Sequence, residues 1–206
     1  ARPWASRNLA VPPPETVAPG PVWLKLSTGS GLNARLRWPP DARTRARLDR
    51  ALAAVRQAPH AYGVAWGEWW YHYITPHVFL EEDLTDRMGG RPEVKVFVRD
   101  GAVRAFYCIR HHAGGRHEQA WHAPDGAPLP GLTAGYRPLD APLPDRIETI
   151  LNAAAAIGRA FRLVRVDFIV TDGRPRLGEL TLGHLNGNFR LDPPELDARL
   201  CRDLFG

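Results

Sequence analysis

Two lysines are the first candidates for chemistry, because almost all the basic residues are arginines. Of the 27 Lys and Arg residues, only Lys25 and Lys95 are lysines. An ammonium group is a compact point charge that suits a position beside a phosphate. Lys25 also precedes Gly29, Ser30 and Gly31, in a loop whose backbone N–H groups could surround a phosphate. A plain glycine-rich turn, with two lysines retained by chance, is the alternative explanation.

A second group of polar residues interrupts a predicted hairpin near the end of the sequence. Arg165, Asp167 and Glu179 lie in strands that otherwise carry mainly apolar side chains. A three-residue turn centred on Gly173 would pair the two carboxylates, whereas a two-residue turn would place Glu179 on the other face. We predict the three-residue turn, because both carboxylates could then hold one Mg²⁺. The alternative is a solvent-facing sheet edge with ordinary charges.

Lys95 lies in another predicted hairpin. Valines alternate over residues 93–99, and Asp100-Gly101 is a typical two-residue hairpin turn. A regular hairpin closed by this turn places Lys95 opposite Phe106.

Periodicity and turn residues predict the elements that must position these side chains. Strands and helices occur in both halves of the chain, which indicates an α+β fold with two lobes. We expect an extended lead-in over 1–21, a small lobe over 22–84 and a large lobe over 85–206. The expected elements are strands at 22–26, 32–38, 77–80, 163–170 and 175–182, a helix capped by Asp41, a helix from Pro144 to Phe161, a loop over 111–144, and a terminal helix over 193–204 capped by Asp192.

Composition limits the class of protein. The chain has 206 residues, 44% of them hydrophobic and 24% charged, which is typical of a globular protein and excludes a disordered chain or a fibre. The longest apolar stretches are too short to span a bilayer. Two cysteines are too few for a disulfide framework, so a reducing cytoplasm is expected. The net charge of +5 suggests an anionic partner such as a nucleotide. No motif supports a nucleic-acid-binding module.

Two further groups of residues allow two interpretations each. Four histidines within 111–122 could bind a metal, but no Cys or acidic residue has a structural-zinc spacing with them, which favours ordinary loop histidines. The aromatic segment 66–73 could stack on a sugar or a base, and core packing is the expected role.

The order of these features along the chain resembles the ATP-grasp superfamily. The closest resemblance is to the teichuronopeptide-biosynthesis (TupA-like) ATP-grasp family. The Glu-Trp-x-Tyr-x-x-Ile-x-Pro string at 68–76 is specific to that family's pattern, whereas the glycine loop alone is not. The segments that carry the resemblance are WLKLSTGSG, GEWWYHYITPHVFLEEDL, EVKVFVRDG and VRVDFIVTDGRPRLGELT.

The resemblance implies an ATP-grasp fold, in which two α+β lobes clasp a nucleotide cleft, and it implies ATP and Mg²⁺ as cofactors. It also implies a role for each matching residue. Lys25, Gly29, Ser30 and Gly31 would contact the phosphates of ATP, Glu81, Glu82 and Leu84 the adenine, Asp86 the ribose, Lys95 a phosphate, Arg165 the transferring phosphoryl group, and Asp167 and Glu179 the Mg²⁺.

The sequence departs from the family pattern at several places. Thr181 stands where many ATP-grasp enzymes have a metal-binding Asn, so we expect Asn186 or Asn188 to complete the metal shell. Few residues precede Lys25, so we expect the usual additional N-terminal domain to be reduced, absent or supplied by a partner domain or subunit. By position alone, Arg110 and Arg190 are candidates for holding a substrate carboxylate.

The expected function is an ATP- and Mg-dependent carboxylate–amine ligase that forms an amide or peptide bond through an acyl phosphate. The substrates would be an amine and a small-molecule, peptide or polysaccharide carboxylate, and the resemblance suggests the tailoring of cell-surface polymers or peptides. The alternatives are an ATP-grasp phosphotransferase and a non-catalytic nucleotide-binding module.

Overall fold

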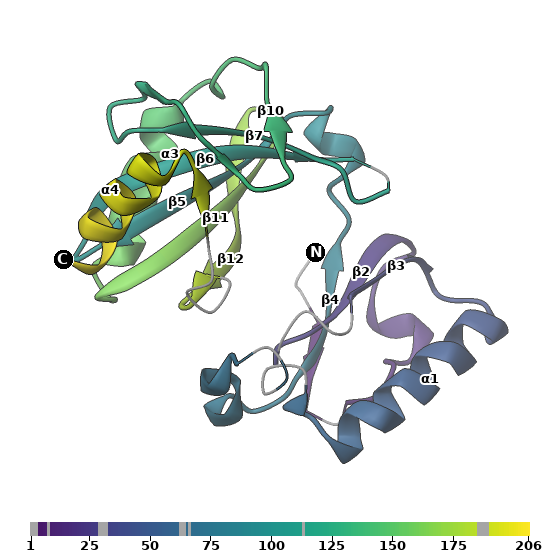
Figure 1. Cartoon of the computed structure of the whole chain (residues 1–206). Coiled ribbons are helices and arrows are strands. Elements are labelled where there is room, and N and C mark those ends of the chain that lie inside the picture. Colours follow the sequence, from purple (N-terminus) through teal and green to yellow (C-terminus); the bar gives the residue numbers. More distant parts are fainter. Residues whose placement is uncertain are drawn as a thin grey trace. The chain divides into compact units, whose positions relative to one another are not determined.

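The computed structural model describes the chain except for residues 1–3, 8, 29–32, 62–64, 66, 113 and 185–189. The chain divides into two compact units, residues 1–84 and 85–206 (Figure 1). Each unit combines antiparallel strands with helices, so the fold class is α+β, as predicted. No helix in the described part of the chain has the length and apolar character needed to cross a membrane.

Unit 1 is built on a four-stranded antiparallel sheet with the strand order β1-β4-β2-β3. Its long helix, α1, begins where predicted, because the Asp41 side chain accepts a hydrogen bond from the Thr44 N–H at 2.6 Å. Leu48 and Leu52 of α1 pack in the core with the buried side chains of β2 and β4. The elements are β1 (Trp4–Ser6), η1 (Pro14–Thr16), β2 (Gly20–Leu26), β3 (Asn33–Trp38), α1 (Ala42–Gln57), η2 (Trp69–Tyr73) and β4 (Val78–Glu82).

The aromatic residues of η2 do not form a core. Trp69 is 65% exposed and Tyr73 is 80% exposed. The two rings contact each other edge to face, with centroids 6.2 Å apart. The expectation of core packing is therefore wrong for these two side chains.

Unit 2 is built on a seven-stranded sheet with the order β10-β7-β6-β5-β11-β12, in which β8 also pairs with β7. All of its strand pairs are antiparallel except β10 with β7. A separate two-stranded ladder joins β9 and β13. The elements are η3 (Asp86–Met88), β5 (Glu93–Arg99), β6 (Ala102–His111), β7 (His117–His122), β8 (Pro128–Leu129), β9 (Leu132–Thr133), β10 (Arg137–Pro138), α3 (Ile147–Gly158), β11 (Leu163–Thr171), β12 (Arg174–Thr181), β13 (Leu191–Asp192) and α4 (Pro194–Phe205).

The two faces of this sheet carry different helices. The buried valines of β5 alternate with Lys95 and Phe97, so the two sets of side chains point to opposite faces. The valine face packs against α3, and the Phe97 face packs against α4 (Figure 1). Lys95 pairs with Asp167 and Phe97 pairs with Arg165 across β5 and β11, so all four side chains lie on the α4 face.

Several sequence predictions for unit 2 are wrong. The region 111–144, expected to be a loop, contains β7 to β10, and histidines 117 and 122 lie on β7. Helix α3 begins at Ile147, because Arg146 is left-handed with a φ of 64°. Asp192 does not cap α4, because it is paired in β13 and Pro193 occupies the cap position.

Both predicted hairpins close with a two-residue Asp-Gly turn and contain one β-bulge. Asp172 and Gly173 have φ values of 50° and 70°, which fits the type I′ turn that Asp-Gly favours. The predicted three-residue turn is therefore wrong. A bulge beyond Asp167 nevertheless restores the predicted pairing of Asp167 with Glu179. In the other hairpin a bulge after Phe97 places Lys95 opposite Tyr107, not opposite Phe106.

Candidate functional site

The candidate site is a row of charged side chains on the α4 face of the unit 2 sheet. Three adjacent strands, β5, β11 and β12, place Lys95, Asp167 and Glu179 directly beside one another. The neighbouring row pairs Phe97, Arg165 and Thr181. The strand register therefore brings together four of the predicted site residues, Lys95, Arg165, Asp167 and Glu179.

Asp167 lies at the centre of this cluster and is only 3% exposed. Its Oδ2 atom accepts hydrogen bonds from Lys95 Nζ at 2.6 Å and from Arg165 Nη2 at 2.7 Å. Its Oδ1 atom accepts a hydrogen bond from Arg165 Nε at 2.7 Å. Lys95 Nζ also lies 3.0 Å from an oxygen of Glu93. The buried carboxylate is thus held between two cations, as a buried charge must be.

The cluster stays ionised because its charges compensate one another. Burial alone would raise the pKa of Asp167, but hydrogen bonds and charges from Arg165 and Lys95 outweigh it and lower the pKa. Burial alone would lower the pKa of Lys95, but the carboxylates of Asp167 and Glu93 raise it above its ordinary value. Burial raises the pKa of the neighbouring Tyr107 to about 12, so its phenol stays neutral.

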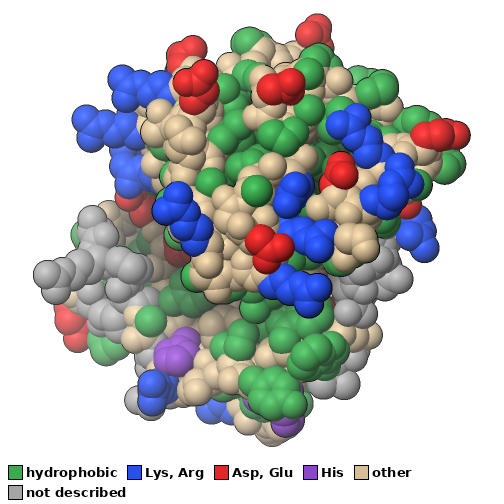
Figure 2. Space-filling view, turned by 90° about the vertical axis from the view of Figure 1, so that its left-hand side faces the viewer, with side chains coloured by type: hydrophobic (Ala, Val, Ile, Leu, Met, Phe, Trp, Pro, Cys, Tyr) green, Lys and Arg blue, Asp and Glu red, His purple; other side chains and the backbone are tan. Residues whose placement is uncertain are grey.

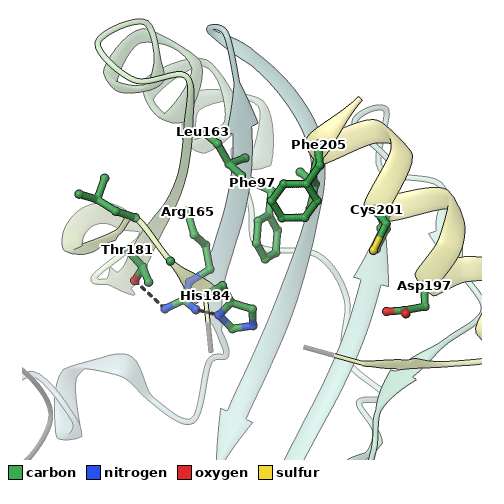
Figure 3. Close-up of a pocket in the computed structure, with 12 residues that line it drawn as sticks. Phe97, Leu163, Arg165, Thr181, His184, Asp197, Cys201 and Phe205 are labelled. Atoms are coloured by element: carbon green, nitrogen blue, oxygen red, sulfur yellow. Dashed lines mark hydrogen bonds between the residues drawn. The ribbon is translucent and has the colours of Figure 1, made fainter. Parts of the chain in front are cut away.

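Arg165 is fixed in place by more than its carboxylate partner. Its Nη2 atom donates to Thr181 Oγ1 at 2.9 Å, and its Nη1 atom contacts His184 Nδ1 (Figure 3). A guanidinium can only donate, so His184 Nδ1 is the acceptor and Nε2 carries the ring proton. Burial, reinforced by the charge of Arg165, lowers the pKa of His184 to about 3.

The two facing carboxylates suit a Mg²⁺ ion. Mg²⁺ is usually held by one or two carboxylates together with waters and substrate phosphates. Oδ1 of Asp167 accepts one of the hydrogen bonds described above, so it retains acceptor capacity for a further ligand. Glu179 is exposed on β12. Among the described residues there is no group of three His, Cys, Asp or Glu side chains placed to hold a metal. Asn186 and Asn188 lie outside the described residues.

In unit 1 the predicted phosphate-binding lysine is part of an ion pair. Lys25 Nζ lies 2.6 Å from an oxygen of Glu81, and each of these side chains is 33% exposed. Glu82 is exposed, and Leu84 is partly buried at the last position of the unit. The loop residues Gly29, Ser30 and Gly31 lie outside the described part of the chain.

The remaining predicted residues have other surroundings. Asp86 is exposed in η3. Arg110 donates to the carbonyl of Gly90 at 2.9 Å and lies 3.2 Å from an oxygen of Glu118. The Arg190 side chain is 75% exposed and lies 3.8 Å from an oxygen of Asp197. These contacts of Arg110 and Arg190 are not with the Lys95–Asp167 cluster.

Two of the histidines of residues 111–122 contact each other, and a third contacts a carboxylate. His111 Nδ1 lies 3.0 Å from His117 Nδ1, and His112 Nε2 lies 3.2 Å from an oxygen of Glu118. In the described part of the chain they belong to no group that could hold a metal.

Sequence reasoning missed three polar residues with structural roles. Tyr107 faces Lys95 only because of the bulge in β6, which periodicity cannot reveal. His184 follows the last strand of the hairpin closely, and it contacts Arg165, but no sequence spacing indicated that contact. Asp83 is buried in unit 1, where it accepts hydrogen bonds from Trp23 at 3.3 Å and from Arg35.

Comparison with solved structures finds ATP-grasp ligases. D-alanine–D-alanine ligase from Bacillus anthracis is 18% identical, with a TM-score of 0.46, over 88% of this chain and 50% of that one. The ATP-grasp ligase PsnB, in complex with a minimal precursor, is 17% identical, with a TM-score of 0.47, over 98% of this chain and 54% of that one. The D-cycloserine synthetase DcsG is 18% identical, with a TM-score of 0.39, over 88% of this chain and 55% of that one.

The chain thus spans about half the length of these solved proteins. No family model matches the sequence, and no curated protein matches it either.

Proposed function

We propose that this chain is an ATP-grasp enzyme, an ATP- and Mg-dependent carboxylate–amine ligase. The observation that carries the proposal is the row Lys95–Asp167–Glu179, with Arg165 bound to Asp167 on the same sheet face. Two cations and two carboxylates in adjacent strand positions are the groups that a magnesium-bound triphosphate requires. The order of the matching segments along the sequence supports the same family.

The arrangement suits phosphoryl transfer because that reaction depends on positioning and electrostatic stabilisation. The Lys95 and Arg165 side chains are 12% and 9% exposed, so they are partly shielded from water. Charges in such surroundings act more strongly on a phosphate than charges in bulk solvent. Their bonds to Asp167 fix both cations before a substrate binds, so little reorganisation is needed.

Each residue that the family resemblance matches has a role in this proposal. In unit 2, Lys95 contacts a phosphate of ATP, Arg165 stabilises the transferring phosphoryl group, and Asp167 and Glu179 hold Mg²⁺. When bound, this ion neutralises phosphate charge. In unit 1, the partly exposed ammonium of Lys25 contacts phosphate. The remaining assignments are Gly29, Ser30 and Gly31 to phosphate, Glu81, Glu82 and Leu84 to adenine, Asp86 to ribose, and Asn186 or Asn188 to the metal.

The reaction proceeds in two steps. An oxygen of the substrate carboxylate attacks the γ-phosphorus of ATP, the bond to the β-phosphate oxygen breaks, and ADP leaves. The amine nitrogen then attacks the carbonyl carbon of the acyl phosphate, phosphate leaves, and the nitrogen loses a proton to give the amide. Arg165 stabilises the charge on the transferring group in the first step. The resemblance to the TupA-like branch favours substrates from cell-surface polymers or peptides and a cytoplasmic reaction.

Trapping with hydroxylamine tests this proposal without knowledge of the natural amine. The protein is incubated with Mg-ATP, hydroxylamine and a panel of amino acids and acidic sugars, and hydroxamate and ADP are measured. A ligase gives both products in equal amounts with at least one acid. Glu179→Gln should abolish both, whereas Glu148→Gln, an exposed Glu on α3, should not. A stable phosphorylated product without hydroxamate would indicate a phosphotransferase, and bound nucleotide without turnover a non-catalytic module.

A further inference from the structure

A cavity of about 130 Å³ lies in unit 2 between the sheet and α4. Phe97, Leu163, Leu200 and Leu204 are among the apolar residues that line it. Leu182 and Phe205, which are 51% and 63% exposed, also line it. Figure 2 views the molecule from the side on which the C-terminus lies in Figure 1, and it shows hydrophobic side chains on the surface among basic and acidic ones.

The polar groups of this pocket are unevenly distributed. Arg165, Thr181 and His184 lie together, whereas Leu163 and Phe205 lie away from them (Figure 3). Asp197 lines the pocket from α4, but its Oδ1 atom accepts the Leu191 N–H at 3.0 Å. Arg165 is the only Lys or Arg side chain that lines the cavity, among the residues that the structure describes.

The cavity volume indicates what size of group it can hold. Apolar protein cavities of about 150 Å³ bind benzene. A cavity of about 130 Å³ therefore suits a phenyl ring or a branched alkyl group of similar size. A polar group without a partner would be costly among these leucine and phenylalanine side chains.

Arg165, at the polar end of the pocket, indicates which polar group the ligand should carry. Hydrogen bonds to the described residues use four of the five N–H groups of Arg165: two to Asp167 through Nε and Nη2, one to Thr181 and one to His184. One N–H of Nη1 can therefore still donate to a carboxylate oxygen. In the proposed function, Arg165 is also the residue beside the transferring phosphoryl group.

We propose that this pocket selects the acid substrate of the ligase, and that the acid is a carboxylate bearing an aromatic or branched aliphatic group. The carboxylate lies at Arg165, and the apolar group fills the space between β5, β11 and α4. The inference rests on the proposed function for the identity of the ligand as a substrate, but the binding itself needs neither ATP nor Mg²⁺. Arg110 and Arg190, the sequence candidates for this role, do not line the cavity.

Cys201 supplies a matched pair of variants for the test. It lines the pocket from α4 and is exposed, so replacing it does not disturb a core position. Cys201→Trp fills the cavity, whereas Cys201→Ser leaves it open. Circular dichroism and the melting temperature of each variant establish that it is folded before binding is measured.

The experiment is ligand-observed NMR titration without nucleotide, using 3-phenylpropionate, acetate and 3-phenylpropanol as probes. The proposal predicts that 3-phenylpropionate binds to the wild type and to Cys201→Ser and that its affinity falls at least about tenfold in Cys201→Trp, because overpacking a filled space is unfavourable. Acetate and 3-phenylpropanol each lack one of the two recognised groups and should bind more weakly than 3-phenylpropionate.

Equal affinity of 3-phenylpropionate for Cys201→Trp and Cys201→Ser would overturn the proposal, as would absence of binding to the wild type. Equal affinity of the acid and the alcohol would overturn the role of Arg165. The outcome is independent of hydroxylamine trapping. Binding of 3-phenylpropionate without any hydroxamate would mean that the pocket exists and that the ligase assignment is wrong. Hydroxamate formation without binding of 3-phenylpropionate would support the ligase assignment and overturn the proposed pocket.

Discussion

Lys95 and Asp167 form a buried ion pair between β5 and β11, with Nζ 2.6 Å from Oδ2. The side chains are 12% and 5% exposed. Arg165 supplies a second cation to the same carboxylate, with Nε 2.7 Å from Oδ1. A buried ion-pair cluster adds little net stability compared with apolar side chains, and such clusters are candidates for binding or catalytic sites.

Removal of the lysine from this pair should destabilise the protein strongly. Lys95→Met leaves the buried carboxylate of Asp167 with one cation fewer, and we expect a loss of about 3–5 kcal/mol in the free energy of unfolding. Lys25→Met is the matched control, because that lysine is one-third exposed, and it should cost less than about 1 kcal/mol. Urea denaturation at pH 7 measures both changes. Equal losses of unfolding free energy in the two variants would mean that the Lys95–Asp167 ion pair contributes no more to stability than a surface ion pair.

A side chain at Gly158 should destabilise the packing of α3 on the sheet. A Cβ atom at this position would lie 2.2 Å from a methyl carbon of Val98. Gly158→Ala should therefore cost about 1–3 kcal/mol, although alanine favours helix by about 1 kcal/mol.

Ala156→Gly, at an exposed position of the same helix, isolates the helix propensity and should cost about 1 kcal/mol. Thermal or urea unfolding of both variants makes the comparison. A stabilised Gly158→Ala variant would show that α3 can move away from β5.

The two cysteines should differ in their reaction with thiol reagents across a wide pH range. Cys108 is buried, and burial raises its pKa from 9.0 to about 12, whereas Cys201 is exposed. We expect a disulfide reagent to titrate one thiol in the folded protein at pH 8 and still one at pH 10, and two after denaturation. Cys201→Ser should leave none in the folded state. Rapid reaction of a second thiol without denaturant would contradict the burial of Cys108.

The same shift predicts the sign of a pH effect on stability. Between pH 9 and pH 12 the thiol of Cys108 is protonated in the folded protein and increasingly ionised in the unfolded chain. The folded state therefore holds more protons, and the contribution of Cys108 to stability is present below pH 9 and decreases as the pH rises. Cys108→Ala should have a shallower decline in unfolding free energy than the wild type between pH 8 and pH 10.

The sequence predicted the main elements of both hairpins because turn residues and alternation are local signals. Asp-Gly turns and alternating valines fix where β5 and β6 begin and reverse. No such local pattern marks the position of a bulge. A bulge shifts every residue beyond it by one position, so Lys95 faces Tyr107, and Asp167 meets Glu179 despite a turn of the other length.

The candidate site could be predicted only in part, because residue types are visible in the sequence, whereas contacts that depend on the path and packing of the chain are not. Residue types identified Lys95, Arg165, Asp167 and Glu179, and the register places them on one face. The contact between Arg165 and His184 depends on how the chain turns after β12. The apolar pocket depends on the packing of α4 against β5 and β11, which no sequence spacing reveals.

The proposed magnesium–nucleotide site is tested most directly by the Mg-dependence of ADP binding, measured by isothermal titration calorimetry. We expect the wild type and the control Glu148→Gln to bind ADP in the presence of Mg²⁺ and to lose most of their affinity in excess EDTA. Glu179→Gln should weaken Mg-ADP binding by about tenfold or more while its affinity in EDTA stays close to that of the wild type. Absence of ADP binding by the wild type, or binding that neither EDTA nor Glu179→Gln changes, would contradict the proposed magnesium–nucleotide site.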